Sequence, residues 1–176
     1  MSESAFNELR LGEKVIEDDL TPSELLWRQV CDHSWDTQYA LPGLDSFGPQ
    51  KSDKRKPSYS RSTVVTAQES RDWHNKMARS MSRGVWACSI EDVDAAGTRA
   101  IDDSKTKLEP DEQRSPGHAY VDYQHLSKAG MRTVKGLLLK AALRHKEIPT
   151  IDTPHVDEEP SPEVSATVDG PESPAE

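Results

Sequence analysis

Three side chains of this sequence are of the types that carry out nucleophilic catalysis together. Asp122 and His125 are separated by two residues, and an acid at this spacing can orient an imidazole to act as a general base. Ser46 is the candidate nucleophile that such a base would deprotonate. The sequence therefore predicts, as one of its possible functions, a small hydrolase that uses Ser46, Asp122 and His125.

The segment Asp122-Tyr123-Gln124-His125 resembles the Asp-x-x-His block that precedes the last helix of SGNH-type esterases. The resemblance implies an esterase-like role, with Gly43-Leu44-Asp45-Ser46 in the place of their Gly-Asp-Ser segment. One extra residue intervenes there, and the glycine and Asn-Asp blocks that supply oxyanion donors are missing. The simpler interpretation is a strand end followed by a helix N-cap, so we lean against catalysis.

A transferase is the other catalytic alternative, and it depends on Arg28. This residue lies in Leu25–Val30, a segment that suits either a strand or a helix begun by the capping box at residues 21–24. An arginine on a strand beside polar loops is similar to the arginine that contacts the dinucleotide in ADP-ribosyltransferase-type folds. The sequence shows no glutamate matched to that pattern.

Binding rather than catalysis is the main prediction, and it draws on a basic segment. Residues 51–61 hold five bases against one acid and contain an aromatic side chain, so they could neutralise phosphates and stack one base. A solvated charge run is the simpler interpretation, because one loop gives no extended positive surface. The candidate binding residues are Arg28, Lys54, Arg55, Lys56 and Tyr59.

Metal and disulfide chemistry have little support. The spacing of His118, Asp122 and His125 matches no fixed zinc signature, and we predict neither a metal nor another cofactor. Cys31 and Cys88 form no C-x-x-C pair, which favours two reduced thiols and a cytoplasmic location. No apolar run approaches the roughly 20 residues of a membrane span, so no membrane association is expected.

The composition predicts one domain with two appendages in a chain of 176 residues. Residues 149–176 contain six of the twelve prolines, eight acids and no Lys or Arg, which predicts a disordered acidic tail. The remaining residues 1–148 therefore carry a net charge of only −1. We expect an N-terminal arm over 1–20 and a domain over 21–148 whose residues 31–62 are irregular.

The expected fold class is α+β, with a small sheet packed by two helices. One helix is expected at about residues 67–82, with Trp73, Met77 and Met81 along its buried face, and another at about 127–146. Buried strands are expected at residues 85–90 and 118–123. Trp86 and Leu138 should then belong to one core.

Several segments together resemble a group of small standalone bacterial proteins. The matching segments include Leu26–Val30, Gly84-Val85-Trp86-Ala87 and His118-Ala119-x-Val121-Asp122-Tyr123, and the resemblance covers about residues 26–146. It implies a bacterial, cytosolic origin and no particular reaction. The sequence thus favours a module that binds a protein partner, with nucleic acid as a weaker possibility and a small hydrolase or transferase as the alternative.

Overall fold

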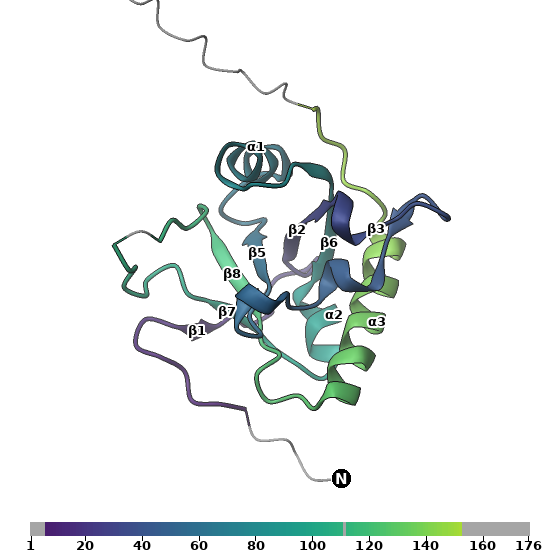
Figure 1. The fold of residues 1–176 in the computed structure, drawn as a ribbon. Coiled ribbons are helices and arrows are strands. Elements are labelled where there is room, and N and C mark those ends of the chain that lie inside the picture. Colours follow the sequence, from purple (N-terminus) through teal and green to yellow (C-terminus); the bar gives the residue numbers. More distant parts are fainter. Residues whose placement is uncertain (1–5, 111, 153–176) are drawn as a thin grey trace, which may run out of the picture.

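The α+β fold expected from the sequence is confirmed by a computed structural model, which describes residues 6–110 and 112–152. Six antiparallel strands form one sheet in the order β1-β7-β8-β5-β2-β6, and a separate pair, β3 and β4, lies in the connection after β2 (Figure 1). The strands are β1 Lys14–Val15, β2 Leu25–Cys31, β3 Trp35–Asp36, β4 Leu41–Pro42, β5 Ser58–Arg61, β6 Ser82–Ser89, β7 Ala100–Asp102 and β8 His118–Val121. The α-helices are α1 Ala67–Met77, α2 Ile90–Ala95 and α3 Lys128–His145, and the 3-10 turns are η1 Asp32–Ser34, η2 Leu44–Phe47 and η3 Lys51–Asp53.

Strand β2 settles the segment that the sequence left ambiguous. Leu26 and Val30 are fully buried on one side of the strand, as the period of two requires. The strand pairs with β6 from Leu25 opposite Ser89 to Cys31 opposite Ser82. The apparent capping box before it is not used to start a helix, because Glu24 binds Arg61 on the neighbouring strand instead.

Helix α1 is shorter than the prediction and buries a different face. It ends at Met77, Met81 lies beyond it, and β6 begins at Ser82. Met77 and Met81 are 39% and 41% exposed. The helix is held by polar side chains instead, since Nη2 of Arg71 donates to the Ser82 carbonyl and Oδ1 of Asn75 accepts from the Ser82 amide. The two methionine side chains therefore face outward and do not pack against the sheet.

Helix α3 supplies the largest covering of the sheet. It packs on β6 and on η2, and its buried residues include Val134, Leu138 and Ala142. Trp86 and Leu138 belong to the same hydrophobic core, as expected from the sequence. No helix in the described part of the chain is both long enough and apolar enough to cross a membrane.

Both chain ends contribute more to the fold than their composition indicated. In the arm, β1 pairs with β7, and Ile16 is part of the core. The first tail residues lie against α1, where Arg71 binds Thr150 and the Ile151 amide donates to Gln68. The disorder predicted for the tail otherwise concerns residues 153–176, which lie outside the described residues. Region 31–62, expected to be irregular, contains β5 in the middle of the sheet.

Candidate functional site

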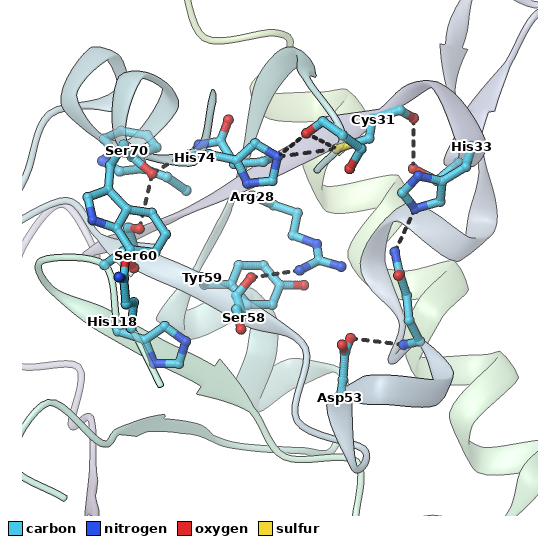
Figure 2. Close-up of a pocket in the computed structure, with 18 residues that line it drawn as sticks. Arg28, Cys31, His33, Asp53, Ser58, Tyr59, Ser60, Ser70, His74 and His118 are labelled. Carbon is cyan, nitrogen blue, oxygen red and sulfur yellow. Dashed lines mark hydrogen bonds between the residues drawn. The ribbon is translucent and has the colours of Figure 1, made fainter. Parts of the chain in front are cut away.

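A cavity opens where two central strands of the sheet separate. Strands β2 and β5 are paired only at Leu26 with Arg61 and at Trp27 with Ser60. Beyond that point β2 stays with β6 and β5 stays with β8, so the two sides of a split are lined by Arg28, Gln29 and Cys31 and by residues 58–60. The resulting cavity has a volume of about 290 Å³, and side chains from η1, η3, α1 and β8 complete its wall (Figure 2).

Arg28 places a positive charge in this split. Its Nε donates to the Ser46 carbonyl and its Nη1 to the Ser58 carbonyl, both at 2.7 Å, and its Cζ lies 5.3 Å from the centroid of the Tyr59 ring. The residue is only 9% exposed. No carboxylate of the described residues pairs with it. The guanidinium is therefore oriented by dipoles while its full charge is left uncompensated.

The wall formed by α1 is a chain of hydrogen bonds between neutral side chains. Nε2 of Gln29 donates to the Ser70 hydroxyl at 2.9 Å, and Ser70 donates to Ser60 at 3.0 Å. The Ser82 hydroxyl donates to Oε1 of Gln29 at 2.7 Å, which fixes the orientation of the amide. These residues add polarity without adding negative charge.

Cys31 and His74 form a thiol and imidazole pair at one end of the cavity. Nε2 of His74 lies 2.9 Å from the Ser80 carbonyl and 3.5 Å from Sγ of Cys31. A carbonyl can only accept, so Nε2 carries the proton and is not free to deprotonate the thiol. Burial lowers the pKa of His74, which keeps the ring neutral at physiological pH. Both groups donate to the Ser80 carbonyl, so the pair holds the end of the cavity in place and does not form an activated nucleophile.

A second histidine at the cavity is oriented by an acid. Nδ1 of His118 lies 2.6 Å from Oδ1 of Asp103, a buried residue on the segment that follows β7. The carboxylate fixes the tautomer with the proton on Nδ1, so Nε2 is the nitrogen available to a ligand. Asp53 also lines the cavity, but its carboxylate accepts from the Gln50 amide in the capping box of η3.

The hydrolase candidates do not line this cavity, and Ser46 and Asp122 belong to separate hydrogen-bond networks. The buried Ser46 hydroxyl donates to the Ser34 carbonyl at 2.9 Å. Asp122 is 1% exposed and pairs with Arg99 at 3.0 Å, and its other oxygen accepts from the Gln124 amide. The His125 ring packs against Phe6 with centroids 4.3 Å apart. Asp122 thus completes a structural ion pair at the end of β8.

The predicted binding residues lie in three places. Arg28 and Tyr59 lie together at the cavity. Lys56 pairs with Glu13 at 2.8 Å, and Nη1 of Arg55 donates to the Leu126 carbonyl at 3.2 Å. Lys54 and Arg55 line a separate groove beside α3.

Sequence reasoning missed His74, and it considered His118 only as a metal ligand. His118 had one visible signal, a histidine at the start of a β-rich run after a Pro-Gly pair, whereas nothing in the sequence pairs His74 with Cys31. Within the described residues, no group of three or more His, Cys, Asp or Glu side chains is placed to hold a metal ion. No protein-family model, curated protein or solved structure matches this chain.

Proposed function

We propose that this protein is a binding module whose primary ligand is a small anion, a phosphate-bearing or carboxylate-bearing molecule, held in the split between β2 and β5. The observation that carries the proposal is the guanidinium of Arg28, which is buried, aimed by two carbonyls and unpaired with any described carboxylate. Arginine presents a planar fork of donors that suits phosphate and carboxylate oxygens.

The free energy of the unliganded state supports this reading. Burying a cation without a counter-ion costs several kcal/mol in a protein interior, since the charge loses its hydration. Two carbonyl dipoles offset part of that cost, whereas a bound anion would offset the rest through a charge-assisted hydrogen bond. A site of this kind is stabilised by its ligand more than a neutral pocket of equal size would be.

The lining limits what the ligand can be. At about 290 Å³ the cavity is at the lower end of the range for small-molecule sites, which run from about 300 to 1,000 Å³. Its donors are the Arg28 guanidinium and serine hydroxyls, while its one acidic residue, Asp53, is occupied in capping η3. A compact, multiply hydrogen-bonded anionic group fits these properties better than an apolar ligand.

The direct test is thermal stabilisation by anions at constant ionic strength. Inorganic phosphate or pyrophosphate should raise the Tm of the wild-type protein relative to chloride, because a ligand that binds only the folded state stabilises it. Arg28→Gln should lose this gain. Arg83→Gln removes an exposed arginine paired with exposed Asp32 and should keep it. An equal gain in both variants would show that the anions act elsewhere on the surface.

A catalytic role on the same ligand has one observation in its favour, the Asp103 and His118 pair at the cavity. A carboxylate-oriented imidazole is the arrangement of a general base, which contributes on the order of 10²–10⁴-fold to a rate. His118→Gln would then abolish turnover of the ligand and leave anion-dependent stabilisation intact. Without turnover in the wild-type protein, the pair serves to position an acceptor, Nε2 of His118, at the cavity.

The remaining functional predictions stay predictions. A protein partner and a bacterial, cytoplasmic setting were expected from the sequence, and the two unpaired cysteines are compatible with a reducing compartment. The hydrolase built on Ser46, Asp122 and His125 gains no support from the hydrogen bonds of Ser46 and Asp122.

A further inference from the structure

A second basic site lies outside the cavity, in a groove between the η2–η3 segment and the first half of α3. Its volume is about 550 Å³. Six of its lining residues are bases and one, Asp45, is an acid; the bases are Lys51, Lys54, Arg55, Lys128, Arg132 and Lys135. Leu44, Pro49 and Met131 form its apolar part. The groove therefore combines an apolar floor with a dense positive charge.

Most of this charge has no internal counter-ion. Lys135 pairs with Asp45 at 2.7 Å, and Arg55 donates to a backbone carbonyl. The other four bases form no ion pair with a described residue; they are Lys51, Lys54, Lys128 and Arg132. All four are exposed. Like charges gathered without acids repel one another, so this arrangement favours an external polyanion.

The tertiary fold, and not the local sequence, creates this surface. Residues 51–55 alone are a short charged loop, and α3 alone is an amphipathic helix with scattered bases. The fold places the two face to face across about 75 positions of sequence, with the Lys135 side chain lying over Gly48, where an added Cβ would meet Cε at 2.0 Å. The groove thus has positive charge on both sides.

The backbone of the loop is held in an uncommon conformation. Lys54 and Arg55 have φ values of 49° and 64°, the left-handed region that non-glycine residues rarely occupy. The loop is fixed by the bond from Arg55 to Leu126 and by the Tyr123 amide, which donates to the Arg55 carbonyl at 3.1 Å. Two adjacent basic residues are therefore kept at this tip despite the cost of their conformation.

From this groove we infer a second binding activity, independent of the cavity: it takes the sugar-phosphate backbone of single-stranded nucleic acid. Phosphates would lie against the bases on the two sides, and sugars and bases would cover the apolar floor. An unpaired strand exposes base faces that can cover Leu44, Pro49 and Met131, whereas the bases of a duplex are stacked on one another and a lipid surface offers no such faces.

The chain's own acidic tail is the main competing occupant. Its described beginning is bonded to α1 through Thr150 and Ile151, next to the C-terminal end of α3. The groove lies at the other end of this 18-residue helix, which is about 27 Å long at 1.5 Å per residue (Figure 1). Residues 153–176 could span this length when extended, but they contain no Phe, Tyr or Trp for the apolar part of the groove, whereas a nucleic-acid strand supplies bases, so an external strand is favoured.

Fluorescence anisotropy with a labelled single-stranded oligonucleotide of about 12 nucleotides tests the inference, since this length is within the usual site sizes. The wild-type protein should bind, and log K should fall with log salt with a slope of about −3 if four phosphates are neutralised. The groove variant is Lys51→Glu, Lys128→Glu and Arg132→Glu combined. We expect it to bind at least about tenfold more weakly at low salt.

The matched control reverses three exposed lysines elsewhere, Lys14→Glu, Lys76→Glu and Lys140→Glu, for the same change in net charge. It should keep most of the affinity, and unchanged circular dichroism should show that both triple variants are folded. Equal losses in the two variants would overturn the inference, as would a duplex that binds as tightly as the single strand. If a peptide of residues 153–176 binds at the groove more tightly than the oligonucleotide does, the groove is the binding site of the tail instead. Oligonucleotide binding that is retained in Arg28→Gln would show that the groove acts independently of the cavity.

Discussion

Two arginines on neighbouring central strands, Arg61 on β5 and Arg28 on β2, are surrounded in opposite ways. Arg61 binds both oxygens of Glu24, at 3.0 and 2.9 Å, and Asp102 at 2.7 Å. Arg28 is more deeply buried and receives only two carbonyl oxygens. One cation is thus neutralised within the fold, and the other is only held in place.

The difference shows how to tell a structural cation from a functional one. Where β2 and β5 remain paired, at Leu26 and Arg61, the acids of adjacent segments close around the charge. Where the strands separate, no acid follows, and the space beside Arg28 stays a cavity. A buried charge that the protein leaves uncompensated is a strong indicator of a ligand site.

The largest expected effect is on stability when Arg61 is removed. Arg61→Met leaves the nearly buried Glu24 and the partly buried Asp102 without their cation, and breaking a buried pair in this way costs about 3–5 kcal/mol. Arg28→Met leaves two carbonyls without a donor, at about 1–3 kcal/mol, but it also removes the cost of an uncompensated buried cation, so its net loss should be well below that of Arg61→Met. Denaturant unfolding of the two variants, at equal m-values, measures the difference.

A double variant, Arg61→Met with Glu24→Gln, serves as the control. It removes the uncompensated carboxylate and should recover part of the stability lost in Arg61→Met. Glu24 is only 5% exposed, so an isolated charge there carries a large desolvation cost. Equal losses for Arg61→Met and Arg28→Met would contradict the comparison, since they would mean that both cations are structural.

Local patterns predicted much of the fold and failed at identifiable places. Helices α1 and α3 begin at Ala67 and Lys128, within one residue of the expected starts, and they are capped by Thr66 with Glu69 and by Ser127. Helix α1 ends early because Asn75 and Arg71 bind the backbone of β6, a tertiary contact with no periodic signature. Strand β5 was hidden because its neighbours in the sequence are basic and polar.

The candidate site was predictable only in part. Arg28 and Tyr59 were singled out for their types, and they meet at the cavity. The split between β2 and β5 depends on where ladder pairing stops, which alternation along a single strand does not encode. His118 and Asp103 lie 15 positions apart and meet through the adjacent strands β7 and β8, so their pairing required the topology.

A smaller effect is expected from acid, and it distinguishes the surroundings of the two arginines. Burial acts to raise the pKa of Glu24, but hydrogen bonds from Arg61 and Thr63 outweigh it and hold the pKa below its ordinary 4.5. A folded-state pKa below the unfolded value contributes stability above about pH 4.5 that is lost as the pH falls through the folded pKa. Glu24→Gln should flatten this part of the stability profile.

Arg28→Met should leave the acid dependence as it is in the wild-type protein, because no described carboxylate depends on Arg28. Glu13 contributes to the same window in every variant: burial raises its pKa, while bonds from Lys56 and Arg10 lower it to a net value of about 2. Melting temperatures measured from pH 7 down to about pH 2.5 would show the contrast. The curves of the wild-type protein and Glu24→Gln should converge in acid. Parallel curves for Glu24→Gln and the wild type would mean that Glu24 titrates alike in both states.

The smallest expected effect concerns the Thr63 side chain, which also donates a hydrogen bond to Glu24. The Thr63 hydroxyl donates to Oε1 of Glu24 at 2.5 Å, and Thr63→Val removes this bond while keeping the shape of the side chain. Because Arg61 still binds both carboxylate oxygens, the loss should be only about 1 kcal/mol. Thr133→Val on α3 gives up a hydroxyl bond to a helix carbonyl on the surface and should change stability by less than about 0.5 kcal/mol. If Thr63→Val proves as mild as this control, the Thr63 hydroxyl adds nothing to what Arg61 and the Thr63 backbone amide already supply to Glu24, and the contrast between Arg61 and Arg28 depends only on their acidic partners.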